Sequence, residues 1–373
     1  MSQQTSRPDP SPKQTSPPNP SPKQTSPPNP LSEHRRGGEL PASRAQFPSP
    51  PGSGTKGEGF AVALLPGDGI GGEVIPAARE VLEALRLPLR FAEGEAGFGA
   101  FERRGMALPD ETLRLCEASD AVLFGATQSP MTKVDGYRSP ILALRRRFDL
   151  FANLRPAAQG GIDLLIVREN TEGLYSGRER VEDEGRTAIA ERVITEQASA
   201  RIVRAACEQA MQRRRHLTIV HKANVLKETC GLFRRVAFEV AAEFPELTVE
   251  EMLVDSCALR LVERPQRFDV IVTTNLFGDI LSDLAAGLTG GLGLAPSANV
   301  GAGVPVFEPV HGSAPDIAGK GVADPRAAIL SAALMLGHLG YAKEAERLRA
   351  TALATPHAGT ARGTTEAIIE RLK

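Results

Sequence analysis

Two carboxylates four residues apart, Asp279 and Asp283, carry the most specific chemistry in this sequence. They stand at the start of a helical pattern, so both side chains fall on one face of the expected helix. A buried-strand run, residues 270–272, comes just before them, and ligands of open α/β sheets collect where strands end. Adjacent carboxylates repel, and a divalent cation that prefers oxygen ligands relieves the repulsion. The pair predicts a metal site; the alternative is a solvated acidic turn favoured by the helix dipole.

Three arginines recur at spacings of ten and thirteen residues: Arg145, Arg155 and Arg168. A guanidinium group is permanently charged and matches a carboxylate with two parallel hydrogen bonds. If the three converge on one cleft, they predict a substrate with several carboxylates. Taken singly, each is better explained as a surface charge.

Three further residues have types suited to catalysis or metal binding. Tyr175 is one of only three tyrosines, Lys222 follows an expected strand, and Asp255 follows the apolar residues 252–254. A buried lysine has a lowered pKa and serves as a base, and a tyrosine can donate a proton. Asp255 is a candidate third oxygen ligand for a metal. Without context, structural roles remain open for Tyr175 and Lys222.

Two glycine-rich segments are candidates for nucleotide binding. Residues 67–72 fit the GxGxxG pattern of a dinucleotide-binding turn. However, Asp68 lies within this turn and Glu73 follows it, where a pyrophosphate needs positive potential. We therefore expect a tight turn lining a cleft rather than a Rossmann phosphate loop. Residues 308–321, before a long helix, can present backbone amides and one carboxylate to a nucleotide.

The first 57 residues differ in composition from the rest. They hold 14 of the 29 prolines and repeat the ten residues SPKQTSPPNP at positions 11–20 and 21–30. Such a segment buries little apolar surface, so we expect a disordered tail with local polyproline II structure. It has neither the apolar run of a signal peptide nor an amphipathic transit helix.

Charge and cysteine usage exclude several classes of protein. The tail carries seven Lys and Arg against three Asp and Glu, which leaves 37 against 42 in the remaining 316 residues. This mildly acidic balance predicts no nucleic-acid binding, and no apolar stretch reaches the ~20 residues of a membrane span. The four cysteines are far apart and form no CxxC pair, so we expect buried thiols in the cytoplasm.

Apolar runs at residues 60–65, 120–125, 161–167, 218–221 and 269–274 predict buried strands with helices between them. This alternation is typical of a mostly parallel α/β sheet. Residues 327–348 predict one amphipathic helix.

Taken together and in this order, the motifs of residues 58–373 resemble the metal-dependent β-decarboxylating dehydrogenases, the isocitrate, isopropylmalate, homoisocitrate and tartrate dehydrogenases. The resemblance implies a two-domain α/β fold that is not a Rossmann fold. It implies a discontinuous cofactor-binding domain from residues 58–150 and 290–373. Residues 151–289 would form a metal, substrate and dimerisation domain.

The resemblance also implies roles, residue by residue. The metal, Mg²⁺ or Mn²⁺, would be bound by Asp255, Asp279 and Asp283. The substrate would be held by Ser139, Arg145, Arg155, Arg168, Tyr175, Lys222 and Asn224. The cofactor would contact Ile70, Glu308, His311, Gly312, Ser313, Ala314, Asp316 and Asp324.

Members of this family are dimers or dimers of dimers, in which Lys222 and Asp255 would come from the partner subunit. Asp316 matches members that use NAD, because its carboxylate accepts from the ribose hydroxyls and repels a 2′-phosphate. Asp324 is a departure, since the family usually has Asn near the adenine. The implied reaction is oxidation followed by loss of CO₂. Lys222 would take the hydroxyl proton, directly or through water, and Tyr175 would protonate the enolate carbon.

The segment 125–145 bears most on the substrate. Isocitrate enzymes usually carry Asn where Ile141 stands, and isopropylmalate enzymes have an apolar run here. The polar residues 137–139 predict contact with a distal carboxylate. The segment is most similar to homoisocitrate dehydrogenases, although some relatives carry an arginine where Leu142 stands. We therefore expect NAD-dependent oxidation of homoisocitrate to 2-oxoadipate, on the aminoadipate route to lysine, with isocitrate as a second substrate.

Three alternatives stay open: an isocitrate or isopropylmalate dehydrogenase, a non-catalytic regulatory subunit, and a binding protein that acts through its proline-rich tail. The complete set of candidate catalytic and metal residues weighs against the regulatory subunit. No feature of residues 1–57 supports the third alternative.

Overall fold

One ten-stranded sheet runs through residues 59–373, the part of the chain that this computed structural model describes. The strand order is β2-β1-β3-β12-β11-β4-β5-β10-β8-β9. Neighbours are parallel except for the pairs β11–β12, β11–β4 and β4–β5. The strands are β1 Phe60–Gly67, β2 Leu89–Glu93, β3 Ala121–Ala126, β4 Ala152–Gln159, β5 Ile162–Glu169, β8 His216–His221, β9 Thr248–Leu253, β10 Val270–Thr273, β11 Pro296–Val300 and β12 Val306–Pro309.

The chain enters one half of this sheet twice. It forms β1, β2 and β3, leaves to form β4, β5, β8, β9 and β10, and returns with β11 and β12. The two halves meet where β11 pairs with β4 and Ala298 lies opposite Leu154. This discontinuous path runs in the same order as the predicted division at residues 150 and 290. The domain boundaries themselves stay a prediction, and the predicted disordered tail lies outside the described residues.

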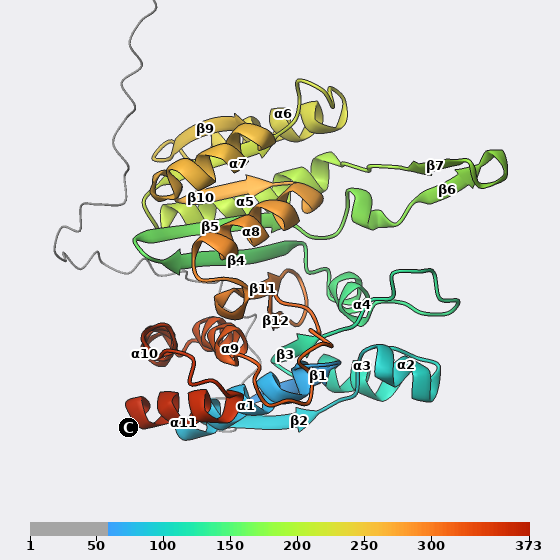
Figure 1. Cartoon of the computed structure of the whole chain (residues 1–373). Coiled ribbons are helices and arrows are strands. Elements are labelled where there is room, and N and C mark those ends of the chain that lie inside the picture. The colour runs from blue at the N-terminus through green and yellow to red at the C-terminus, as the bar shows by residue number, and fades with distance from the viewer. Residues whose placement is uncertain (1–58) are drawn as a thin grey trace, which may run out of the picture. The chain divides into compact units, whose positions relative to one another are not determined.

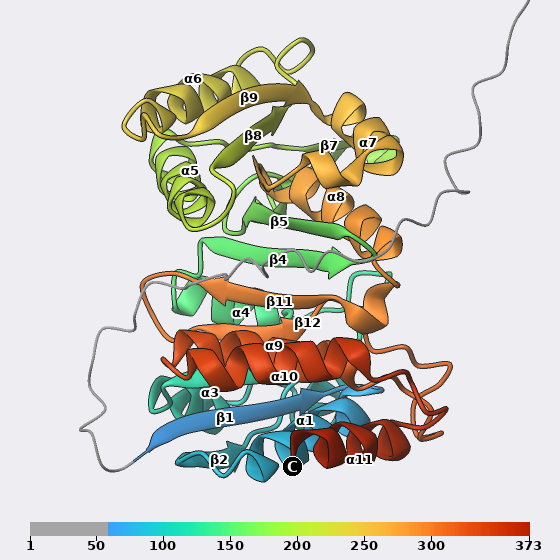
Figure 2. The ribbon, with the colours of Figure 1, turned by 90° about the vertical axis from the view of Figure 1, so that its left-hand side faces the viewer.

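Helices cover both faces of the sheet (Figures 1 and 2). One face packs against α1, α5, α6 and α9, and α10 and α11 pack on α9 and α1 to complete a single continuous hydrophobic core. On the other face α3 and α4 bury one core and α7 and α8 bury a second. The helices are α1 Gly71–Ala84, α2 Phe98–Arg104, α3 Asp110–Glu117, α4 Pro140–Arg147, α5 Glu196–Met211, α6 Thr229–Ala241, α7 Val254–Glu263, α8 Asn275–Leu288, α9 Arg326–His338, α10 Ala342–Ala354 and α11 Ala361–Leu372.

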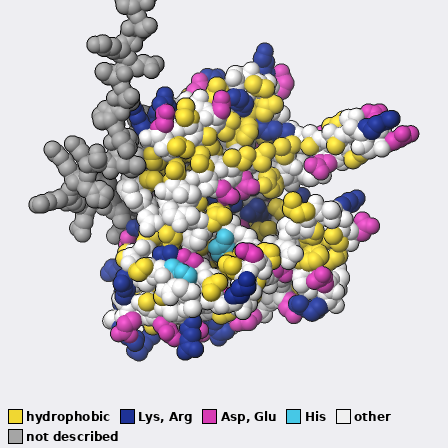
Figure 3. Space-filling view, in the orientation of Figure 1, with side chains coloured by type: hydrophobic (Ala, Val, Ile, Leu, Met, Phe, Trp, Pro, Cys, Tyr) yellow, Lys and Arg dark blue, Asp and Glu magenta, His cyan; other side chains and the backbone are white. Residues whose placement is uncertain are grey.

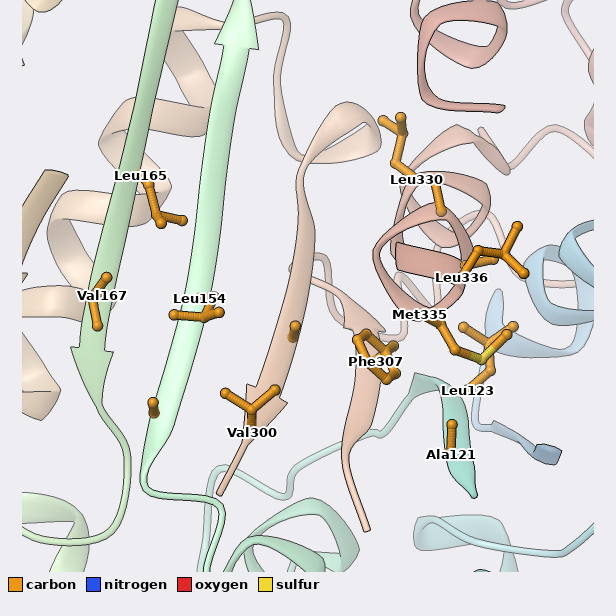
Figure 4. Packing of buried hydrophobic residues seen from close by; sticks show 14 of the residues in the cluster. Ala121, Leu123, Leu154, Leu165, Val167, Val300, Phe307, Leu330, Met335 and Leu336 are labelled. Atoms are coloured by element: carbon orange, nitrogen blue, oxygen red, sulfur yellow. The ribbon is translucent and has the colours of Figure 1, made fainter. Parts of the chain in front are cut away.

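The continuous core explains why the central strands are apolar at every second residue. Side chains along a strand alternate between faces. Leu154, Val300 and Phe307 lie in the core on this face, to which Met335 and Leu336 of α9 also belong (Figure 4). The residues between them in sequence face the other side of the sheet, and these residues build the site described below.

The five expected strands are confirmed as β1, β3, β5, β8 and β10, with ends within two residues. The single helix predicted over residues 327–348 is wrong, because α9 and α10 are separate. Gly340 has a φ of +90°, and the Tyr341 amide donates to the Leu336 carbonyl, which closes α9 with a Schellman motif. Nor is α9 amphipathic, since ten of its thirteen residues are buried.

Two strands outside the main sheet form a hairpin, β6 Glu179–Glu182 and β7 Thr187–Ala190, which extends away from the sheet (Figure 1). Its side chains are mostly exposed. All four cysteines are buried and free, in keeping with the prediction that they form no disulfide framework. Among residues 59–373, no helix has the length and apolar character needed to cross a membrane.

Candidate functional site

A layer of buried asparagine side chains lies where the two halves of the sheet meet. Asn153 on β4 donates to Ser297 Oγ at 2.9 Å and to Asn299 Oδ1 at 3.0 Å, both on β11. Asn170, just after β5, also donates to Asn299 Oδ1 at 3.0 Å. The Asn153 and Asn299 side chains point away from the α9 side, because each lies between two residues of the continuous core on its strand. The centre of this face is therefore polar.

Two of the predicted arginines are fixed by this layer. Arg145, in the last turn of α4, donates from Nε to Asn299 Oδ1 at 3.0 Å and from Nη2 to Glu308 Oε1 at 3.0 Å. Arg155 donates from Nε to Asn153 Oδ1 at 2.6 Å. Both side chains are about nine-tenths buried or more. A buried charge persists only when it is paired and hydrogen-bonded, and here the asparagines and Glu308 supply the partners.

The third arginine, Arg168 at the end of β5, is held by the first turns of α8. Its Nε and Nη2 donate to Asn275 Oδ1 at 3.0 and 2.8 Å, and its Nη1 donates to Asp279. Gly278 permits this approach, since a Cβ there would lie 2.6 Å from Arg168 Cγ. The glycine of the Asn275–Asp279 motif is thus required by packing against the arginine.

The three arginines are close enough to affect one another. Burial lowers the pKa of Arg168 most, Arg155 and Arg145 lower it further, and Asp279 opposes the shift. Burial also lowers the pKa of Arg155, again against the effect of Asp279. The structure therefore brings the predicted arginines together. Glu308 pairs with Arg145, and two further carboxylates lie beside Arg155 and Arg168.

Those carboxylates are the predicted metal pair. Because α8 begins at Asn275, Asp279 and Asp283 lie beyond its first turn, where a helix dipole has little effect. They share one helix face, and Arg155 Nη1 lies 3.3 Å from an oxygen of each. The dipole explanation for this pair is therefore set aside.

The pKa values of the two carboxylates are shifted in opposite directions. Burial raises the pKa of Asp279, but Arg168 and Arg155 outweigh it and the net shift is downward. Burial raises the pKa of Asp283, Arg155 opposes this, and the negative charge of Asp279 adds to it. A cation placed between them would remove the repulsion, so the pair fits a divalent ion.

Tyr175 joins the same group of side chains. It lies on the short 3₁₀ turn Leu174–Ser176, and its hydroxyl donates to Asp279 Oδ2 at 2.5 Å. The guanidinium carbon of Arg168 lies 5.0 Å from the centre of the Tyr175 ring. Burial and then the hydrogen bond to Asp279 raise the pKa of the phenol. Tyr175 therefore keeps its proton at neutral pH, as a proton donor must.

Lys222 and Asp255 form a separate pair. Lys222, just after β8, donates from Nζ to Asp255 Oδ1 at 2.6 Å, and that bond lowers the pKa of Asp255. No hydrogen bond or ion pair within residues 59–373 joins either residue to Asp279 or Asp283. No three His, Cys, Asp or Glu side chains of this region meet at metal-binding distances. One chain by itself therefore supplies a carboxylate pair but not the predicted set of three.

The remaining predicted substrate contacts are exposed or half-buried. Ser139 is the N-cap residue of α4, and its side chain makes no capping hydrogen bond. Asn224 is exposed in the loop after β8, two residues beyond Lys222. Neither joins the arginine cluster through a hydrogen bond within the described residues.

The predicted cofactor loop packs against the glycine turn after β1. The Ile70 amide donates to the Ser313 carbonyl at 2.9 Å, and a Cβ at Gly69 would lie 2.0 Å from that same oxygen. The Gly319 amide donates to Glu73 Oε1 at 2.7 Å. Because Glu73 already caps the loop with its carboxylate, the turn is unsuited to a pyrophosphate. It instead holds the loop that would carry the nucleotide.

The side chains of that loop differ in exposure. Asp316 and Gly312 are exposed, and Ala314 has a φ of +41°. His311 Nδ1 donates to the Gly312 carbonyl at 3.0 Å, which leaves Nε2 as a buried acceptor with no hydrogen-bond partner among residues 59–373. Burial lowers the pKa of His311, so the ring is neutral at physiological pH. Such an acceptor fits the exocyclic amine of an adenine.

Asp324, the departure from the family pattern, is neutralised by a neighbour. Arg326 Nη2 donates to Asp324 Oδ2 at 2.7 Å, and its Nε lies 3.0 Å from Oδ1. The Arg326 amide also donates to Oδ1 at 3.0 Å. The carboxylate is thus occupied at the start of α9, and it adds little free negative charge to the cofactor side.

The substrate-specificity segment is held by aromatic packing. The Tyr137 ring lies 5.5 Å from Phe98 and 5.4 Å from Phe101, and its hydroxyl donates to the Gln128 carbonyl at 3.1 Å. Tyr137 therefore shapes the loop, whereas its neighbour Arg138 is exposed. Within the described region Arg138 has no ion pair or hydrogen bond. The Arg138 guanidinium is therefore available to pair with a carboxylate of a ligand.

Sequence reasoning missed four residues that organise the site: Asn153, Asn299, Asn275 and Ser282, the last of which accepts from Arg155 Nη1 at 2.8 Å. A signal was present in one case. Residues 296–300 alternate apolar and polar side chains, a pattern that is typical of a strand. No strand was predicted there, and β11 is buried along its whole length.

Comparison with known proteins gives a consistent result. The family model described as isocitrate/isopropylmalate dehydrogenase matches residues 61–366. An isocitrate/homoisocitrate dehydrogenase from Thermus thermophilus is 56% identical over 332 residues, covering 84% of this chain and 99% of that one. A 3-isopropylmalate dehydrogenase from Archaeoglobus fulgidus is 53% identical, covering 77% of this chain and 88% of its own. The crystal structure of isocitrate dehydrogenase from Methylococcus capsulatus aligns with a TM-score of 0.79 at 43% identity, covering 84% and 99% of the two chains. The predicted fold class is confirmed.

Proposed function

The chain belongs to the isocitrate/isopropylmalate dehydrogenase family, and we propose that it converts homoisocitrate to 2-oxoadipate with NAD as hydride acceptor, a step in lysine biosynthesis. It is a β-decarboxylating dehydrogenase, an oxidoreductase class that generally uses NAD(P) and a divalent metal. The observation that carries the proposal is the cluster of three buried arginines beside the Asp279–Asp283 pair. An isocitrate or 3-isopropylmalate dehydrogenase is the alternative.

The arginine cluster supports a substrate with several carboxylates. Arg145, Arg155 and Arg168 lie on one face of the sheet, and burial followed by the charges of neighbouring arginines lowers the pKa of Arg168, while burial lowers that of Arg155. A guanidinium beside a carboxylate forms paired, charge-assisted hydrogen bonds. Substrate carboxylates would therefore relieve the same repulsion that the folded protein tolerates when it brings these side chains together.

Asp279 and Asp283 would hold Mg²⁺ or Mn²⁺, with Asp255 of a second copy as the third oxygen ligand. A divalent cation supplies electrostatic stabilisation of negative charge on substrate oxygens. In this arrangement Lys222 accepts the proton of the substrate hydroxyl. Tyr175, whose raised pKa keeps it protonated, delivers a proton to the product carbon.

The cofactor would be NAD rather than NADP. Asp316 is exposed on the loop that the glycine turn supports, and its carboxylate has no cationic partner within residues 59–373. A 2′-phosphate beside it would meet an uncompensated negative charge, whereas ribose hydroxyls would donate to it.

Apolar residues near Lys222 support a homodimer in which Lys222 and Asp255 serve the partner's site. Val225 is 65% exposed, Val262 on α7 is 58% exposed and Ile280 on α8 is 58% exposed. Figure 3 shows hydrophobic side chains gathered on this face over the region of α7 and α8. Exposed apolar patches of this kind mark protein–protein contacts.

Subunit complementation tests this arrangement. Chains carrying Lys222→Met are co-refolded with chains carrying Asp283→Asn, each strongly impaired alone. If Lys222 acts across the interface, each mixed dimer has one intact site and activity returns. If both residues act within one chain, no mixture contains an intact site and activity stays absent.

Arg138 is the residue that we assign to the distal carboxylate of homoisocitrate. The decisive assay follows NADH formation with homoisocitrate, isocitrate and 3-isopropylmalate, and compares kcat/KM for wild type and Arg138→Leu. We expect the variant to lose about 10-fold on the two tricarboxylates, the worth of one exposed ionic hydrogen bond, and to lose nothing on 3-isopropylmalate. Lys133→Leu, another exposed cation of the same loop, is the matched control.

The results of this assay distinguish the choice of substrate from the proposed dehydrogenase activity. A wild-type preference for 3-isopropylmalate would support the alternative substrate and leave the fold and family intact. Absence of turnover with all three substrates would refute the proposed function.

A further inference from the structure

We infer that His221 is a positioning residue for Lys222, acting through one defined tautomer of its ring; this rests on the proposed role of Lys222 as the base. The His221 side chain is buried at the end of β8, directly before Lys222. Its Nδ1 accepts the backbone N–H of Ala223 at 3.1 Å. The His221 ring therefore holds the backbone amide of Ala223, the residue that follows Lys222.

The other nitrogen fixes the ring. His221 Nε2 lies 3.0 Å from Glu251 Oε2 on the neighbouring strand β9. Because Nδ1 accepts, Nε2 carries the proton and donates to the carboxylate. Glu251 is held in turn by both Nη2 and Nε of Arg234 on α6. The hydrogen bond from Arg234 lowers the pKa of Glu251 to about 2, so the acceptor stays ionised.

The backbone after Lys222 is also closed upon itself. The Leu226 amide donates to the Lys222 carbonyl at 2.9 Å, and the Val225 amide donates to it at 3.1 Å. The loop is thus fixed by its own turn on one side and by His221 on the other. The side chain of Lys222 is left to reach Asp255 and the surface of the molecule.

Two substitutions separate this role from general packing. His221→Ala removes the acceptor and the tautomer lock. His221→Asn keeps an oxygen that can accept the N–H two residues later, as asparagine commonly does in Asx turns. We expect His221→Ala to lower kcat by about 10- to 100-fold, the cost of misplacing a catalytic group by about 1 Å, with KM nearly unchanged. We expect His221→Asn to recover most of the loss.

Two controls complete the experiment. His216→Ala removes the histidine at the other end of β8, which lies near Glu250, and should leave kcat unchanged. In a Lys222→Met background, His221→Ala should cause no further loss, because residues that act as a unit are not additive. Equal losses for the alanine and asparagine variants, or a full loss in the Lys222→Met background, would overturn the inference.

Hydrogen exchange gives a readout that does not depend on turnover. The Ala223 amide should exchange faster in His221→Ala and near the wild-type rate in His221→Asn, with the full-length protein throughout. Unchanged exchange in His221→Ala would refute the geometry. Altered exchange with an inactive wild type would instead leave the geometry standing and count against the proposed function.

Discussion

The two faces of the central sheet differ in polarity although the same strands form both. On the α9 face, one continuous apolar core spans both halves of the sheet. On the other face, the apolar cores under α3–α4 and under α7–α8 are separate, and the asparagine layer with its arginines fills the interval. The comparison indicates that hydrophobic burial joins the halves on one side, so that charge can be buried on the other.

Neighbouring residues of β4 offer the largest test of this division, since Leu154 faces the core and Arg155 faces the site. Leu154→Ala should lower the free energy of unfolding by about 2–5 kcal/mol and leave kcat/KM of the folded fraction within about threefold. Arg155→Met should lower kcat/KM by at least ~10², because it removes a buried charge partner worth about 2–5 kcal/mol.

Chemical denaturation and steady-state kinetics on both variants give the answer. If the two variants lose stability and activity in similar proportion, the assignment of stability to the Leu154 face and activity to the Arg155 face is wrong.

Substitution of the proposed acid or base comes next in size. Tyr175→Phe and Lys222→Met should each lower kcat by at least ~10², the usual contribution of one acid or base. Thermal unfolding should be little changed for Lys222→Met, because that side chain lies outside all three hydrophobic cores. Near-normal kcat in either variant would remove the role assigned to that residue.

A smaller effect is expected in the pH dependence of stability. The folded pKa of Asp279 is lowered, so its contribution is fully present above the unfolded value of about 4 and is lost as the pH falls through the folded pKa. The folded pKa of Asp283 is raised, so its ionisation costs stability as the pH rises from the unfolded value through the folded one.

Unfolding free energies measured from acid to neutral pH should therefore diverge between two matched variants. The deficit of Asp279→Asn relative to wild type should shrink toward acid. Asp283→Asn should gain relative to wild type toward neutral pH. Parallel curves would contradict the opposite pKa directions of these two carboxylates.

The smallest effect concerns Asp324. Asp324→Asn should change KM for NAD by less than about threefold, because Arg326 already neutralises the carboxylate, and should cost no more than about 1 kcal/mol of stability, typical of a partly exposed ion pair. Arg326→Gln, which frees the Asp324 charge, should weaken NAD binding more than Asp324→Asn does. The reverse order would assign Asp324 a direct cofactor contact.

Local features whose cause lies within a few residues could be predicted from the amino-acid sequence. The spacing of Asp279 and Asp283 put both on one helix face, and the apolar runs located five buried strands, because helical and strand periodicities are set by the backbone. The charges of Asp68 and Glu73 argued against a phosphate-binding turn, which stays a prediction, since charge in a turn can be read from the sequence without the fold. The break at Gly340 was missed because one glycine in an apolar pattern is tolerated in either structure.

Which polar residues contact one another became known from the three-dimensional fold. Asn153 and Asn299 are 146 residues apart in sequence, and their contact follows from the antiparallel register of β4 and β11, which no local pattern encodes. The same holds for Arg168 against Gly278 and for His221 against Glu251. Long-range pairing depends on the free energy of the whole sheet rather than on any one segment. The residues that arrange the site could therefore be identified only from their contacts in the folded protein.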